Sequence, residues 1–169
     1  MEFKIANKTN KFTLLLIVVG VLFTGIGVAL NINDHHFTTR ILVSGLTSTM
    51  FFFFIGIGAL FFLSLQYATE TGWYASIKRV IEAVAGYLPV GISLLILMLL
   101  VITLLDGAHI YSWMDPEVVA HDELIQGKSA YLNKTFFWVR TLVYLGVYFW
   151  FWTGFRKRSL EEDRVGGTD

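Results

Sequence analysis

Residues 12–30, FTLLLIVVGVLFTGIGVAL, form an uninterrupted apolar run without a single charged side chain. A bilayer has a hydrocarbon core of about 30 Å, which a helix of about 20 apolar residues crosses. Backbone polar groups in lipid must be bonded within the protein, so only helices and closed barrels span a membrane. Because the run lacks the two-residue alternation of a barrel strand, it predicts a membrane-spanning helix.

Three more stretches of this kind follow along the chain. We expect spans at residues 12–32, 41–67, 84–105 and 136–155, within a single membrane domain that covers residues 1–169. The predicted fold class is therefore all-α, an integral membrane four-helix bundle. Lysines precede the first span, but its apolar run exceeds the 7–15 residues of a signal-peptide core, so we interpret it as a retained signal-anchor helix.

The composition narrows the classes of function. The chain is 55% hydrophobic and its formal net charge is zero, which gives no electrostatic basis for binding nucleic acid. It contains no Cys, which excludes disulfides, Cys-ligated zinc and iron–sulfur clusters on this chain. None of its four histidines lies centrally in a predicted span, which argues against a haem held by two histidines.

The distribution of Lys and Arg around the spans predicts their orientation. The N-terminal segment, the 68–83 connection and the C-terminal tail carry nine of these residues: Lys4, Lys8, Lys11, Lys78, Arg79, Arg156, Lys157, Arg158 and Arg164. The segments 33–40 and 106–135 carry three: Arg40, Lys128 and Lys134. The bias predicts cytoplasmic termini, a cytoplasmic 68–83 connection and a periplasmic 106–135 segment.

The third span has two local features of interest. Residues 72–83, GWYASIKRVIEA, predict a short surface helix that runs into the span. Pro89 lacks a backbone N–H, and its ring clashes with the carbonyl four residues earlier, so we expect a kink near Ala85–Gly86.

The polar 106–135 segment carries its own helix signals. Asp115 is a good N-cap, Pro116 suits the first helical position, and Glu117 places an acid in the first turn. With Gly127 as a C-terminal stop, these signals predict one short helix over residues 116–126. Its apolar residues make no single stripe, which favours contact with several surfaces. The expected partner-docking residues are Trp113, Asp115, Glu117, Val118, His121 and Leu124.

Ionisable residues near this segment allow more than one interpretation. Asp106 and His109 end the third span, and Arg140 lies in the first turns of the fourth. A charge at membrane depth is costly unless it is paired, so we expect either a buried Arg140–Asp106 or Arg140–His109 pair or a contact on a proton or quinone route. His121 and Glu117 lie four residues apart and can pair. One His with nearby acids is weak evidence for metal, so we expect no metal site and no catalytic residue.

Three stretches are similar to a known family. They are AHIYSWMDPEVVAHDELIQGKSAYLN (108–133), LQYATETGWYASIKRVIEAVAGYLPVG (65–91) and FRKRSLEED (155–163). The chain resembles the ActF-type membrane subunit of bacterial alternative complex III, a quinol:cytochrome c oxidoreductase, over roughly residues 50–165. That subunit is related to the membrane subunit of polysulfide reductase.

The resemblance implies a multi-pass subunit of the bacterial inner membrane. It implies contact with lipids, a sister membrane subunit of the polysulfide-reductase type, and periplasmic multihaem cytochrome c and iron–sulfur subunits. The haem c and clusters would lie on those partners, with no cofactor on this chain and quinone nearby. The implied role is structural and docking, with quinone or proton-path contact as an addition. Family members usually have a long insertion where this chain has Asn31–Arg40, and they continue into further spans. One bundle of a larger subunit, a truncated sequence and a split version are therefore all alternatives.

Two other classes of function compete with this one. A small proton channel or transporter would usually need charged residues in the middle of its spans, which these spans lack. A stand-alone quinone- or haem-binding redox protein is disfavoured by the positions of the histidines.

Overall fold

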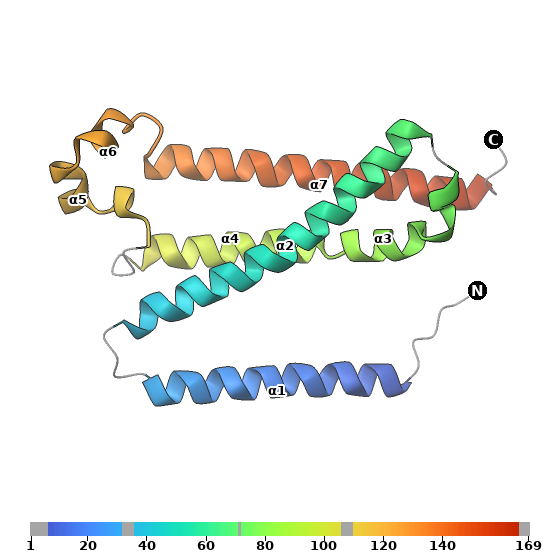
Figure 1. Ribbon diagram of the computed structural model, residues 1–169, viewed down its shortest axis with the longest axis horizontal. Coiled ribbons are helices and arrows are strands. Elements are labelled where there is room, and N and C mark those ends of the chain that lie inside the picture. The colour runs from blue at the N-terminus through green and yellow to red at the C-terminus, as the bar shows by residue number, and fades with distance from the viewer. Residues whose placement is uncertain (1–6, 32–35, 71, 106–109, 166–169) are drawn as a thin grey trace. The chain divides into compact units, whose positions relative to one another are not determined.

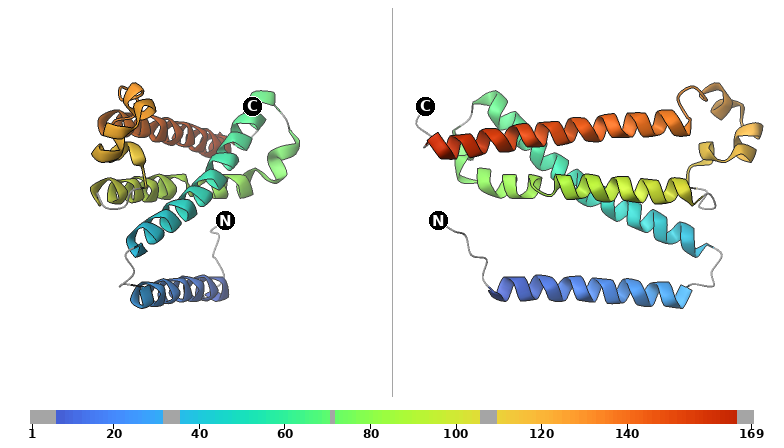
Figure 2. Two further views of the ribbon diagram at one scale, coloured as in Figure 1. Left: turned by 60° about the vertical axis from the view of Figure 1, so that its left-hand side comes forward. Right: turned by 180° about the vertical axis from the view of Figure 1, so that it is seen from behind.

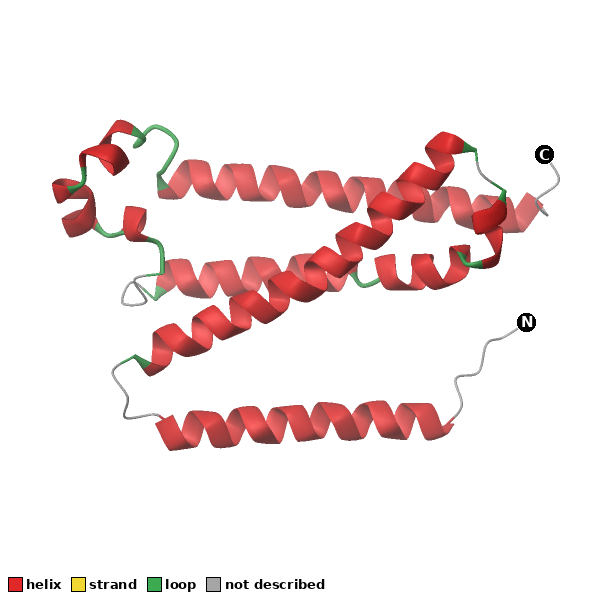
Figure 3. Ribbon diagram, viewed as in Figure 1, coloured by secondary structure: helices red, strands yellow, loops and turns green. Residues whose placement is uncertain are grey.

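The computed structural model describes residues 7–31, 36–70, 72–105 and 110–165, and its secondary structure there is helical, with no strand among these residues (Figures 1 and 3). This confirms the all-α class. Three helices are long and apolar enough to cross a membrane, over Lys11–Asn31, Phe37–Thr69 and Lys78–Leu104. These lengths make the chain a plausible multi-pass membrane protein.

The chain divides into two compact units, residues 1–40 and 41–169. The first contains α1 (Asn7–Asn31). The Thr24 hydroxyl donates to the Gly20 carbonyl at 2.9 Å, and the Asn31 amide to the Gly27 carbonyl at 2.9 Å. These side chains thus satisfy their hydrogen bonds on the helix itself, as a polar group in an apolar surrounding must.

The second unit contains most of α2 and all later elements. The long helices are α2 (Phe37–Thr69), α4 (Leu88–Leu104) and α7 (Lys134–Val165). The short ones are η1 (Trp73–Ser76), α3 (Lys78–Ala85), η3 (Ser112–Met114), α5 (Pro116–His121) and α6 (Glu123–Gly127). Figures 1 and 2 show α4 and α7 running side by side while α2 crosses them obliquely.

The three long helices of the second unit share one apolar core. Its buried residues come from α2, α4 and α7: Phe53, Leu60, Leu88, Ile92, Leu95, Leu99 and Leu145. Leu88 is fully buried. Gly56 of α2 faces it so closely that a Cβ there would lie 3.1 Å from the Leu88 side chain. A larger residue at position 56 would require the buried Leu88 side chain to shift by a few tenths of an ångström.

The break between α3 and α4 lies where Pro89 predicts it. Helix α3 ends at Ala85, residues 86 and 87 form a turn, and α4 begins at Leu88. The chain stays hydrogen-bonded through the break, since the Gly86 N–H donates to the Glu82 carbonyl at 2.8 Å. The helix therefore breaks near the expected kink, and the stretch expected as one short surface helix over residues 72–83 consists instead of η1 and α3, which lead into α4.

Helix α7 is longer than the fourth span that we expected. It comprises 32 residues, Lys134–Val165, and continues as helix through the charged tail. It is not among the three helices that meet the length and composition of a span. Its apolar part carries Arg140 and several Trp and Tyr residues, which makes it more polar than the other long helices.

Candidate functional site

The segment between α4 and α7, residues 110–133, is called the cap segment below. Its first α-helix, α5, begins as predicted. Asp115 has an extended backbone, with φ −88° and ψ 115°, and its carboxylate accepts a hydrogen bond from the Glu117 N–H at 2.9 Å. Pro116 follows in the first turn of α5, where its missing N–H costs nothing.

The prediction of one helix over residues 116–126 was wrong. Helix α5 ends at His121, and Asp122 is extended, with φ −114° and ψ 102°. Its carboxylate accepts from the N–H groups of Leu124 at 2.9 Å and Ile125 at 3.2 Å, and so caps a second helix, α6. An Asp side chain that bonds nearby amides competes with the helical backbone, which is why the helix restarts here. Gly127 ends α6, close to the predicted stop.

Two amide side chains hold the cap segment together. The Gln126 amide donates to the carbonyls of Val119 at 2.9 Å and Ala120 at 3.0 Å, which ties α6 back to the end of α5. Asn133 accepts from the Phe136 N–H at 2.7 Å and so caps α7. Sequence reasoning missed both residues, although an Asn just before an apolar run is a recognisable helix-start signal.

An aromatic cluster joins the cap segment to α7. The ring centroids of Tyr111 and Trp113 are 5.7 Å apart, and each lies close to Phe137, at 5.8 and 5.4 Å. Trp113, which we expected to dock a partner, is therefore partly covered by its own chain. Burial raises the pKa of the Tyr111 phenol. The cap segment thus has an apolar base of its own.

The remaining expected docking residues lie on the outside of the cap segment. Leu124 is 76% exposed and Val118 is 39% exposed. Glu117 and His121 are exposed too, and His121 Nδ1 lies 2.9 Å from the main-chain oxygen of Glu117. His121 therefore bonds the backbone. No group of three or more His, Cys, Asp or Glu side chains that could hold a metal ion occurs in the described part of the chain.

Arg140 lies against aromatic rings. Its guanidinium carbon is 4.0 Å from the centroid of the Tyr131 ring and 5.5 Å from that of Phe136, so its charge is stabilised by cation–π contact. Its Nη1 atom is buried and makes no hydrogen bond to a described residue. Asp106 and His109 lie outside the described residues, so their pairing with Arg140 stays a prediction.

At the opposite end of α7, charged residues join this helix to α3. Lys78 pairs with Glu162 and lies 3.9 Å from Glu82. Arg79 pairs with Asp163, lies 3.0 Å from Glu82, and donates to the Ser159 hydroxyl at 3.4 Å. Lys78 and Arg79 are thus bound to α7 as well as to Glu82 of their own helix. Their partners on α7 are about 80 residues away, a separation that no local pattern reveals.

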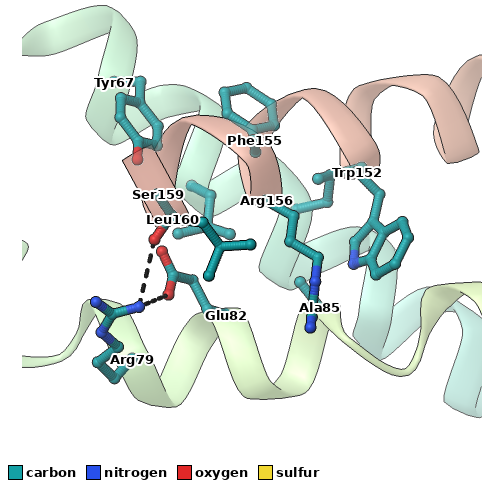
Figure 4. Close-up of a pocket in the computed structure, with 11 residues that line it drawn as sticks. Tyr67, Arg79, Glu82, Ala85, Trp152, Phe155, Arg156, Ser159 and Leu160 are labelled. Atoms are coloured by element: carbon teal, nitrogen blue, oxygen red, sulfur yellow. Dashed lines mark hydrogen bonds and ion pairs between the residues drawn. The ribbon is translucent and has the colours of Figure 1, made fainter. Parts of the chain in front are cut away.

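A cavity of about 160 Å³ lies between the adjoining ends of α2, α3 and α7. Figure 4 shows its lining: Arg156 and Trp152 extend from α7 on the side that faces Ala85 and Glu82 of α3, whereas the Phe155 ring points away from α3. Leu60 and Leu63 of α2 add to the apolar part of the wall. Tyr67 stacks on Phe155, with centroids 5.4 Å apart. The cavity is therefore apolar on one side and lined by charged and hydroxyl groups on the other.

Two polar groups of this cavity have few partners. The Arg156 guanidinium lies 5.6 Å from the Trp152 ring centroid and forms no ion pair with a described acid. The Tyr67 hydroxyl is buried near the Lys78 ammonium, without the geometry of a hydrogen bond to any described residue. Both groups can donate a hydrogen bond to a bound molecule.

Comparison of the chain with protein-family models and with curated proteins gave no match.

Proposed function

We propose that this chain is a membrane subunit of a bacterial quinol:cytochrome c oxidoreductase of the alternative complex III type. Its main role is structural, and it docks periplasmic subunits through the cap segment. The resemblance of residues 108–133 to the ActF-type subunit supports the class of complex. The expected partners are a sister membrane subunit and periplasmic multihaem cytochrome c and iron–sulfur subunits, which carry the cofactors.

The observation that carries the docking role is an exposed leucine on a well-ordered support. Leu124 is 76% exposed, although two capping carboxylates and the Gln126 amide fix the backbone around it. A segment held this firmly presents its apolar side chain without further ordering, and preorganisation of this kind strengthens association. The cap segment also exposes the acids Glu117 and Glu123, which suit a cationic partner such as a c-type cytochrome.

The proposal includes the orientation that the basic residues predict. In it, α7 is the fourth span of the bundle in the inner membrane, both termini are cytoplasmic, and the cap segment is periplasmic. The charged contacts of α3 with α7 then lie at the cytoplasmic face, and Arg140 lies near the periplasmic one. Asp106, His109 and Arg140 are the candidate contacts to quinone or a proton path.

The test is a purification of the tagged chain from native membranes in mild detergent. We expect haem c and iron–sulfur subunits to co-purify, as measured by absorption and electron paramagnetic resonance spectra. The double substitution Val118→Asp and Leu124→Asp removes them while the chain stays in the membrane, because two charges would be buried at the interface. Val165→Asp, at a 54% exposed apolar residue at the other end of α7, is the matched control and keeps them.

Two results would contradict the docking role. One is a chain that purifies without haem-containing partners, and the other is a double variant that retains them in full. A colourless oligomer that conducts protons after reconstitution would instead support the channel class.

A further inference from the structure

The cavity between α2, α3 and α7 is apolar on one side and polar on the other, which matches the two ends of an amphiphile. Leu60, Leu63 and Trp152 line it on the side toward the long apolar part of the helices, and Arg79 and Glu82 line it near the helix ends. At about 160 Å³ it has the room of roughly five water molecules. This is enough for a headgroup fragment and the first atoms of a chain, while the rest of the molecule would extend along the helices.

The single carboxylate of the cavity is already neutralised. Glu82 lies 3.0 Å from the Arg79 guanidinium and 3.9 Å from the Lys78 ammonium. Arg79 also pairs with Asp163, and Lys78 with Glu162. These five charged side chains thus neutralise one another, and Glu82 adds no unpaired negative charge to the cavity lining.

The groups that remain are hydrogen-bond donors. Arg156 has only its contact with Trp152 among the described residues, and the Tyr67 hydroxyl has no hydrogen bond there. Ser159 is buried, and its oxygen accepts from Arg79 at 3.4 Å, which leaves its own hydrogen to donate. A guanidinium and two hydroxyls around one space suit a ligand that only accepts hydrogen bonds and carries negative charge.

We propose that this cavity binds the phosphate of an anionic phospholipid, with Arg156 as its charged contact and the Tyr67 and Ser159 hydroxyls as donors. The phosphate oxygens are the shared chemistry with free inorganic phosphate. The apolar wall beside them favours the lipid, because free phosphate would leave Leu63 and Trp152 uncovered. A guanidinium donates two parallel N–H hydrogen bonds to the oxygens of a phosphate. A neutral quinone carbonyl has one acceptor oxygen and cannot accept such a pair. The site goes beyond the proposed function and does not depend on it.

The test measures lipid binding to the full chain by native mass spectrometry after removal of endogenous lipid with detergent. The probes are phosphatidylglycerol and phosphatidylcholine with equal chains, inorganic phosphate, and a short-chain ubiquinone. We expect Arg156→Gln to weaken phosphatidylglycerol binding about tenfold, as the loss of a charge-assisted hydrogen bond predicts. Lys157→Gln removes the same charge one residue away, outside the cavity lining, and changes binding less than about twofold.

Two further measurements keep the result interpretable. Helix content by circular dichroism shows that each variant is folded, which we expect because Arg156 is exposed. Arg156→Lys keeps the charge but loses the planar pair of donors, so its binding falls between those of the native chain and Arg156→Gln.

Several outcomes overturn the proposal. Equal losses of phosphatidylglycerol binding in Arg156→Gln and Lys157→Gln would mean that the lipid is attracted by the basic tail in general and not by the cavity. Equal affinity for phosphatidylglycerol and for phosphatidylcholine, whose headgroup is neutral overall, would mean that the site does not recognise the anionic charge. Binding of inorganic phosphate as tight as that of the lipid assigns the site to a free anion, and displacement of phosphatidylglycerol by the quinone assigns it to that ring.

Discussion

Replacing Asp122 by Ala removes the carboxylate that starts α6. This oxygen accepts from the N–H groups of Leu124 at 2.9 Å and Ile125 at 3.2 Å. Substitution of an Asp N-cap by Ala costs about 0.5–2 kcal/mol, typically about 1 kcal/mol. Each 1.36 kcal/mol is a factor of ten in an equilibrium constant, so local opening of α6 should increase about 2- to 30-fold.

The assay is amide hydrogen exchange of the cap segment in detergent micelles. Under conditions where exchange follows the opening equilibrium, the rates at Leu124 and Ile125 should rise by this factor. Asp122→Asn is the matched control, because Asn retains an acceptor oxygen and is an equally good N-cap. The amide of Glu117 is an internal reference, since it is capped by Asp115. Equal exchange in the Ala and Asn variants would refute the reasoning, because the carboxylate would then not hold the start of α6.

Two further predictions concern packing. Gly56→Ala should lower the free energy of unfolding by about 1–3 kcal/mol, because its Cβ would meet the Leu88 side chain at 3.1 Å. Gly58→Ala is the control and should be neutral or stabilising, because nothing lies within 4 Å of the added Cβ. Thermal unfolding in detergent distinguishes the two variants, and equal shifts would contradict the packing at Leu88. Arg140→Leu and Tyr131→Leu should show a coupling of about 0.5–1 kcal/mol in a double-mutant cycle of the same measurement, since the guanidinium lies 4.0 Å from the ring centroid, and additive effects would mean that the cation–π contact contributes nothing.

The sequence predicts those parts of the fold that depend on short-range physics. The apolar runs predict the long helices because lipid admits few other backbone structures. Pro89 predicts the break before α4 because a ring in place of an N–H acts within one turn. Asp115 predicts the start of α5 for the same local reason.

The sequence is ambiguous where a residue has two local options. Asp122 lies within a stretch whose sequence pattern otherwise predicts a continuous helix. In the structure it caps a second helix instead, and the Gln126 amide donates hydrogen bonds to the carbonyls that the break leaves at the end of α5. The contacts of Arg79 with Ser159 and Asp163 are a different case, because only the tertiary arrangement brings residues so far apart together. The cavity beside them follows from that arrangement and has no signature in the sequence.

The length of α7 has a mechanical consequence. At 1.5 Å per residue its 32 residues make a rod of about 48 Å, well beyond the thickness of a hydrocarbon core of about 30 Å. One end of the rod carries Phe137, against which the cap segment packs, and the other carries Ser159 and Asp163, which contact α3. A continuous hydrogen-bonded helix resists bending and compression. A force that shifts or tilts α7 at the cap segment should therefore also displace the end of α7 that contacts α3. The chain thus contains a strut that transmits load from the cap segment to α3.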